Sequence, residues 1–294
     1  MPPIAFQERS SSRPMELLTD AVGRPAYGRI DPTLFMFITY PIFFGIMLGD
    51  MAYGLVTMGL GALLMSKSGT NEMLNLGGKF LTYIGFGTVV FGYLYAEFAG
   101  WEIFPHYGSN PAMALQVFYP DINTPETYHA WTASLPLGIE LAFPFHRVVM
   151  TDGGGNLEHL ILLTIYLGVI HVFLGLVIGF RDIMLFGNGH GGFGFVCAFF
   201  EKGAWMILLV GGFMFAYGFI GPADWMMEPG AAISVSATVM LMWTLYKYHG
   251  VPFPINIGLA PIEAVGMMPT VISYVRLFAV GVVGVKIAET GNSM

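Results

Sequence analysis

The sequence is poor in charged residues and in cysteine. Only 11% of its 294 residues are charged and 55% are hydrophobic, whereas about 25% of the residues in a soluble domain are charged. The single cysteine, Cys197, excludes a disulfide framework and a cysteine-based metal site. We therefore predict an all-α, polytopic membrane protein, and we expect neither a cofactor nor a metal ion.

Motifs for nucleotide chemistry are also missing. The sequence has no phosphate-binding loop of the form G-x-x-x-x-G-K-[ST], so the chain should not hydrolyse ATP by itself. Residues 187–192 (GNGHGG) match G-x-G-x-x-G by letter. They follow an apolar helix rather than a strand, so we interpret them as a loop. The formal charge of −7 gives no support for nucleic-acid binding.

Seven windows are apolar enough, and nearly long enough, to cross a bilayer as helices. They are residues 33–48, 51–65, 80–98, 158–179, 203–220, 230–246 and 262–285. The first two are separated only by Gly49 and Asp50, which predicts a tight helical hairpin. The organisation that we expect is a polar lead-in (1–31), the hairpin with a third span (32–98), a long external loop (99–157) and the C-terminal membrane helices (158–294).

The external loop is rich in aromatic residues. These are Trp101, Tyr107, Phe118, Tyr119, Tyr128 and Trp131. They could form a packed cap over the helix ends, or they could anchor the loop at the membrane interface.

The basic residues predict the orientation of these spans. With the N-terminus in the cytoplasm, nine of the twelve basic residues are cytoplasmic: Arg9, Arg13, Arg24, Arg29, Lys67, Lys79, Arg181, Lys202 and Lys247. Only Arg147 and Lys286 fall outside, and Arg276 lies in a span. This distribution agrees with the positive-inside rule.

Arg276 places a permanent positive charge inside an apolar stretch. The nearest charges along the chain are Glu263, 13 residues earlier, and Lys286, 10 residues later. An arginine near mid-bilayer costs roughly 2.5–3.5 kcal/mol on insertion scales and is functional by default. Because a guanidinium keeps its proton, Arg276 suits a counter-charge to a carboxylate or an electrostatic barrier in an ion path. A structural ion pair inside a helix bundle is the open alternative.

Apolar residues surround Arg276 on its predicted helix, residues 262–289. At 3.6 residues per turn, the same side carries Val265, Pro269, Ile272, Ser273, Ala279, Val280, Val283 and Ile287. A buried structural pair would bring further hydrogen-bonding groups, because one carboxylate leaves some guanidinium donors unsatisfied. The stripe therefore favours a surface along which another membrane element slides.

Three polar residues in or beside the earlier spans are further candidates for an ion path. Asp50 follows the first span, where capping the second helix is the competing role. Glu97 closes the third span at the outer interface. His171 lies inside the fourth span, where a hydrogen bond to a neighbouring helix competes with a proton relay.

Glu263 begins the segment that carries Arg276. Thirteen residues place it roughly 140° from Arg276 around an ideal helix. The two side chains should not pair within one straight helix, although Pro269 can bend it.

Two segments resemble the a/I subunit of V-type and archaeal A-type rotary ATPases. Residues 31–33 (DPT) and 41–54 (PIFFGIMLGDMAYG) are similar to the first membrane hairpin of that family. Residues 273–279 (SYVRLFA) are similar to its arginine helix. The two motifs occur in the expected order, and the resemblance covers nearly the whole chain.

The resemblance implies a non-catalytic stator subunit of a proton-translocating rotary ATPase in an archaeal plasma membrane. Its partners would be membrane lipid, a ring of proteolipids that each carry a buried carboxylate, and the peripheral-stalk and central-stalk-associated subunits. Arg276 would match the arginine that faces those carboxylates and separates two aqueous half-channels. The accompanying candidates for ion translocation are Glu263, Ser273, Asp50, Glu97 and His171.

Two other functional classes stay open. A secondary transporter would bind an anionic substrate at Arg276, in a polar pocket flanked by broken helices. A passive scaffold would pair Arg276 with an internal carboxylate such as Glu97 or Glu263.

The chain also departs from the family pattern. The family has a large cytoplasmic arm before this region and an eighth span after the arginine helix, some members have a histidine where this chain has Gly284, and Glu263 matches the family's acidic residue only approximately. We therefore expect a fragment that cannot pump alone. We also expect an open groove about 10 Å wide, the diameter of one helix, beside residues 262–289.

Overall fold

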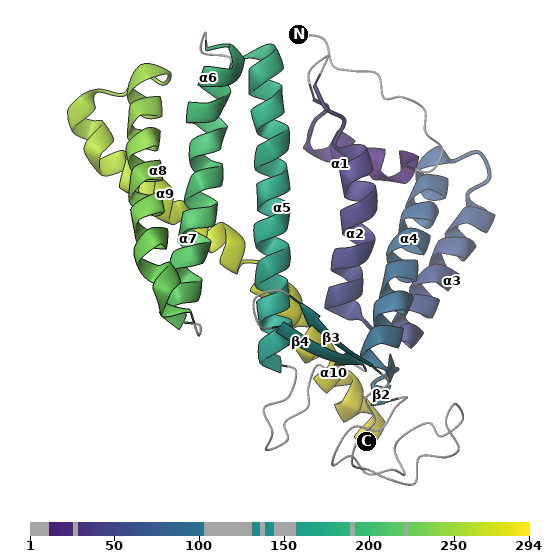
Figure 1. The fold of residues 1–294 in the computed structure, drawn as a ribbon. Coiled ribbons are helices and arrows are strands. Elements are labelled where there is room, and N and C mark those ends of the chain that lie inside the picture. Colours follow the sequence, from purple (N-terminus) through teal and green to yellow (C-terminus); the bar gives the residue numbers. More distant parts are fainter. Residues whose placement is uncertain are drawn as a thin grey trace. The chain divides into compact units, whose positions relative to one another are not determined.

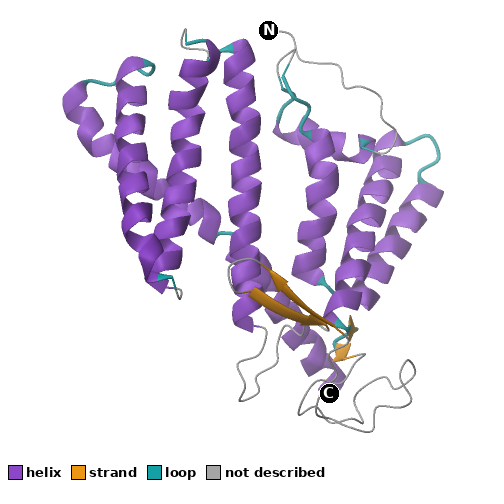
Figure 2. Ribbon diagram, in the orientation of Figure 1, coloured by secondary structure: helices purple, strands orange, loops and turns teal. Residues whose placement is uncertain are grey.

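The computed structural model describes residues 12–25, 29–102, 131–135, 139–143, 157–188, 192–220 and 223–294. These residues are mainly helical, with two short antiparallel pairs of strands (Figure 2). They fall into two compact units. One combines Met1–Thr164 with Val275–Met294, and the other is Ile165–Tyr274.

The first unit holds the N-terminal helices and the last helix (Figure 1). Its helices are α1 (Arg13–Val22), α2 (Thr33–Leu48), α3 (Met51–Lys67), α4 (Glu72–Tyr95) and α10 (Val275–Ser293). Its strands are β1 (Glu97–Phe98), which pairs with β2 (Trp101–Glu102), and β3 (Trp131–Leu135), which pairs with β4 (Ile139–Phe143).

The predicted hairpin of the first two spans is confirmed. Helix α2 ends at Leu48 and α3 begins at Met51. Gly49 between them adopts a left-handed conformation with φ of 31°, which glycine accepts without steric cost. The chain therefore reverses over two residues.

Glycines allow α4 to approach α2 and α3 at backbone distance. A Cβ added to Gly87 would lie 2.1 Å from the Pro41 carbonyl oxygen in α2. A Cβ added to Gly61 in α3 would lie 2.6 Å from the carbonyl oxygen of Gly78 in α4. Small residues at helix contacts are typical of helix association in lipid, where close backbone packing provides much of the stability.

The described residues of the second unit form helices joined by turns, without strands. They are most of α5 (Leu157–Phe186), α6 (Gly194–Ala198), the π-helix η1 (Phe199–Gly203), α7 (Ala204–Ile220), the 3₁₀ helix η2 (Asp224–Met226), α8 (Met227–Lys247) and α9 (Phe253–Ile272). Small and branched apolar residues of α7, α8 and α9 form its core: Ala204, Leu208, Ala237, Leu241, Leu245 and Ala260.

The predicted count of about seven spans is not confirmed. Within the described residues, four segments are long and apolar enough to cross a membrane: Ile161–Phe186, Gly194–Phe219, Asp224–Lys247 and Phe253–Asn292. Helices α2 and α3 are apolar but have only 16 and 17 residues. The chain nevertheless has the composition and the apolar helices of an integral membrane protein.

Much of the predicted lead-in and external loop lies outside the described residues. Within the lead-in, residues 13–22 form α1, which the sequence analysis did not predict. Within the loop, β2, β3 and β4 are described as backbone pairs. The alternatives of an aromatic cap and an interfacial anchor therefore stay predictions.

Candidate functional site

The helix predicted to carry Arg276 without interruption is broken. We expected one helix over residues 262–289, but α9 ends at Ile272 and α10 begins at Val275, with Ser273 and Tyr274 in a turn. The prediction of a continuous helix is wrong for a local reason. The Thr270 carbonyl, which the Tyr274 N–H would bond in a continuous helix, instead accepts the Ser273 hydroxyl, and the Tyr274 N–H bonds Val271.

The turn keeps its own hydrogen bonds. The Ser273 N–H donates to the Pro269 carbonyl at 2.9 Å, and the Tyr274 N–H donates to Val271, only three residues back, at 3.1 Å. The Ser273 hydroxyl donates to the Thr270 carbonyl at 2.7 Å. Back-bonding of this kind bends helices, so Ser273 has a structural role at the break.

Arg276 is the second residue of α10, and its side chain is exposed. No described residue forms an ion pair or a hydrogen bond with its guanidinium. A cation at the N-terminus of a helix is unfavourable by about 0.3–1 kcal/mol, because the helix dipole is positive there. The position of Arg276 is therefore not explained by helix stability.

The face of α10 that bears Arg276 is apolar and exposed. Ala279, Val280, Val283 and Ile287 are exposed, with Val283 at 57% and Ile287 at 66%. The opposite face is buried in the first unit, where α10 packs against α2. Its buried residues are Phe278, Gly281, Val285 and Ala288. In α9, the other stripe residues, Val265, Pro269 and Ile272, are also exposed, as is Ser273.

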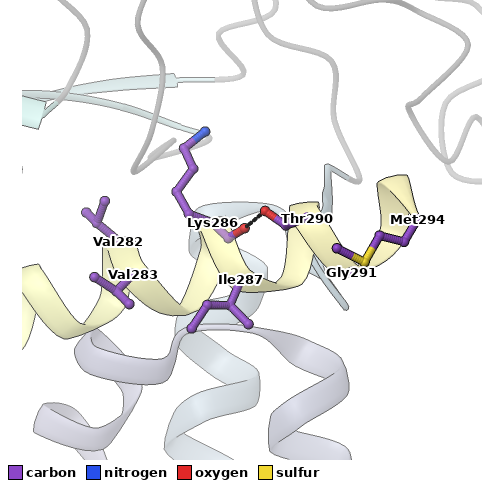
Figure 3. Close-up of a pocket in the computed structure, with 7 residues that line it drawn as sticks. All are labelled: Val282, Val283, Lys286, Ile287, Thr290, Gly291 and Met294. Carbon is purple, nitrogen blue, oxygen red and sulfur yellow. Dashed lines mark hydrogen bonds between the residues drawn. The ribbon is translucent and has the colours of Figure 1, made fainter.

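A shallow pocket extends this exposed side toward the end of α10. Its lining residues are Val282, Val283, Lys286, Ile287, Thr290, Gly291 and Met294. Figure 3 shows Val283 and Ile287 projecting from the helix in one direction and Lys286 in another. The pocket therefore offers an apolar wall with one cation beside it.

Asp50 has the structural role that competed with an ion path. Its side chain is 2% exposed and caps α3, with Oδ1 accepting from the N–H groups of Ala52 at 2.7 Å and Tyr53 at 3.2 Å. The same carboxylate accepts from Ala99 and Gly100 at 2.9 Å each. Asp50 therefore joins the α2–α3 corner to the turn between β1 and β2.

That turn also contacts the end of α10. The Asn292 side chain donates to the Ala99 carbonyl at 2.7 Å. Ala99 and Gly100 both have positive φ, 55° and 76°, as the tight turns of two-residue hairpins require. The Asp50 carboxylate and the Asn292 amide thus contact the same two-residue turn, at its N–H groups and at a carbonyl respectively.

The other predicted carboxylates, Glu97 and Glu263, lie in different units of the chain. Glu97 is 5% exposed in β1, where it lies opposite Glu102 in the strand pair. Glu263 is half-buried in α9, which belongs to the second unit. Neither position tests an ion-translocating role, so both stay predictions.

His171 makes a hydrogen bond outside its own helix, to a residue of the turn that follows α9, and this kind of role competes with a proton relay. Its Nδ1 lies 2.5 Å from the Tyr274 hydroxyl, and both rings are half-buried within the second unit. Tyr274 was not among the candidates predicted from the sequence. It lies beside Arg276 in the SYVRLFA segment, but its partner is 103 residues away.

No family model matches the chain. A subunit I of an A-type ATP synthase from Methanocaldococcus jannaschii is 26% identical over 286 residues, which cover 94% of this chain and 38% of that protein. Its counterpart from Thermococcus kodakarensis is 30% identical over 213 residues, 71% of this chain and 26% of the relative. A V-type ATP synthase subunit I 2 from Treponema pallidum is 37% identical over 98 residues, 33% of this chain and 21% of the relative.

These relatives agree with the resemblance carried by the hairpin and arginine segments. The chain spans less than two fifths of the length of each of them. It belongs to the subunit I family of A-type and V-type ATP synthases.

Proposed function

We propose that this chain forms the membrane part of a stator subunit in a rotary ATPase, with Arg276 as counter-charge to carboxylates on a neighbouring proteolipid ring. The observation that carries the proposal is the exposed Arg276, which has no partner among the described residues, on an exposed apolar face of α10. A stator must present its positive charge to the carboxylates of a moving ring. An internal ion pair would neutralise Arg276 and prevent this interaction.

The proposed chemistry is electrostatic. A ring carboxylate reaching about 4 Å from Arg276 would gain on the order of 4 kcal/mol at an effective dielectric constant near 20. Since one pKa unit corresponds to about 1.4 kcal/mol, this attraction would lower the carboxylate pKa by several units. The carboxylate would release its proton beside Arg276, and the fixed charge would block a direct leak between the half-channels.

The apolar face of α10 supplies the second requirement. Ring subunits that pass Arg276 would slide over Val280, Val283 and Ile287, which offer no hydrogen bonds that each step would have to break. Glu263 and Glu97 are the candidates to line the half-channels, whereas the hydrogen bonds of Ser273 and His171 favour structural roles for those two residues. We assign Asp50 a structural role, because its four hydrogen bonds to backbone N–H groups account for it.

The transporter alternative gains little from the structure. The break between α9 and α10 fits the broken helices of such proteins. However, Arg276 is exposed, whereas a substrate site would enclose it in a polar pocket. The relatives, named as ATP synthase subunits, also favour the stator.

Substitution of Arg276 in the complete ATPase tests the proposal. Arg276→Ala should reduce ATP-driven acidification of membrane vesicles to background while the complex still assembles. Arg276→Lys should also fail, because an ammonium can lose its proton when buried and lacks the planar fork of a guanidinium. Arg181→Ala, which removes an exposed arginine from α5, is the matched control and should acidify normally. Normal acidification by either Arg276 variant would refute the proposal.

A further inference from the structure

Tyr274 occupies a notch on α5. Its hydroxyl lies 2.5 Å from His171 Nδ1, and the two rings meet edge to face with their centroids 5.8 Å apart. One turn before His171, a Cβ added to Gly168 would lie 2.8 Å from Cγ of Tyr274. The missing side chain at residue 168 therefore makes room for the phenol ring, and His171 binds its hydroxyl.

The notch holds the chain where the helix is interrupted. Tyr274 is the last residue of the turn that separates α9 from α10. The next residue, Val275, begins α10, and Arg276 follows. The contact of Tyr274 with α5 therefore limits how far the turn can move relative to α5. Arg276 is only two residues away.

We propose that Gly168, His171 and Tyr274 form a positioning site that holds the turn before α10, and that it thereby restricts the backbone two residues before Arg276. The inference rests on the proposed role of Arg276 as a counter-charge. In a membrane-spanning segment, His171 and Tyr274 each need the other as a hydrogen-bond partner, because an unsatisfied donor or acceptor there is costly. The hydrogen bond from the Tyr274 hydroxyl to His171 therefore favours one position of the ring on α5. A phenylalanine ring would fit the same position but would lack this hydrogen bond.

The same pair could in principle pass a proton, and one substitution separates the two roles. Asparagine at residue 171 places an amide near the position of Nδ1, so it can bond the Tyr274 hydroxyl but cannot carry a proton. Leucine at residue 171 can do neither. A positioning site tolerates asparagine, whereas a proton relay fails with either residue.

ATP-driven acidification by vesicles that contain the complete ATPase, normalised to assembled complex, tests the site. Tyr274→Phe and His171→Leu should each lower the rate about fivefold, as the loss of one hydrogen bond predicts. The double variant should be no slower than the slower single variant, because both remove the same contact. His171→Asn should stay within about twofold of the unmodified protein.

Tyr166→Phe is the matched control on the same helix. The Tyr166 hydroxyl is buried, and it has no hydrogen-bond partner within the described part of the chain. Its removal should leave the rate unchanged. A wild-type rate for Tyr274→Phe would overturn the inference, as would His171→Asn that is as slow as His171→Leu. Arg276→Ala in the same vesicles separates the two proposals. If Arg276→Ala acidifies normally, the stator role fails. If Arg276→Ala is inactive and Tyr274→Phe acidifies at the wild-type rate, the positioning site alone fails.

Discussion

At the scale of single residues, Asp50 and Arg276 are both charged residues in or beside apolar helices, but the structure supports different roles for them. A charged residue within apolar spans is a functional candidate by default. Asp50 is 2% exposed and its carboxylate accepts four backbone hydrogen bonds. Arg276 is exposed and has no such partner among the described residues. Asp50 therefore has a structural role, whereas Arg276 stays a functional candidate.

Asp50→Ala should destabilise the protein by about 2–4 kcal/mol, since it removes a helix cap and leaves backbone donors of the β1–β2 turn unpaired. Thermal unfolding of the purified complex in detergent would measure the loss. Asp50→Asn keeps one acceptor oxygen and should cost less. If Asp50→Asn abolished ion transport without lowering stability, Asp50 would be a channel residue and its structural assignment would be wrong.

At the scale of elements, the glycines of α4 differ in what surrounds them. Gly87 meets the Pro41 carbonyl of α2 at backbone distance, whereas Gly77 has no atom within 4 Å of an added Cβ. Gly87→Ala should therefore destabilise the α2–α4 contact by about 2 kcal/mol, because backbone cannot move aside as a side chain can. The unfolding temperature in detergent reports this change.

Gly77→Ala is the control in the same helix. Alanine favours a helix over glycine by about 1 kcal/mol, so this variant should be as stable as the unmodified protein or more so. If both variants lost equal stability, close packing of α4 would not explain the effect at Gly87.

Local sequence signals predicted most helix positions and their turns. The windows 33–48 and 51–65 match α2 and α3 closely. The third window began eight residues late, because Asn71 caps α4 with its side chain and the polar first turns of that helix hid its start. Hydropathy identifies apolar spans, but a cap extends a helix into polar sequence.

Contacts between distant residues could not be predicted in this way. The cap by Asp50 is local, but its bonds to Ala99 and Gly100 reach about 50 residues along the chain. The seat of Tyr274 on α5 depends on Gly168 and His171, more than 100 residues earlier. The apolar repeat of 3.6 residues predicted one arginine helix across the turn at residues 273 and 274. Pro269 indicated a bend in that helix, but it did not predict where the helix would break.

At the scale of the whole molecule, the predicted orientation has a direct test. Thr70 between α3 and α4 and Asp224 at the start of η2 are both exposed, while Cys197 is 2% exposed. In a Cys197→Ala background, Thr70→Cys should react with an impermeant thiol reagent only from the cytoplasm, and Asp224→Cys only from outside. Reaction of both from one side would overturn the predicted topology.

The central claim is that the exposed face of α10 meets a rotating ring, and disulfide cross-linking tests it most directly. Val283 and Ile287 lie on that face, whereas Ala288, 8% exposed, lies on the buried face. In a Cys197→Ala background, Val283→Cys should cross-link under oxidation to a cysteine placed about two turns from the proteolipid carboxylate, and Ile287→Cys to one about three turns away, because these are their distances from Arg276 along α10. Either bond should stop ATP-driven rotation until it is reduced. Ala288→Cys should not cross-link. If Ala288→Cys reacted and the other two did not, the stator surface would lie elsewhere and the proposed role of Arg276 would be wrong.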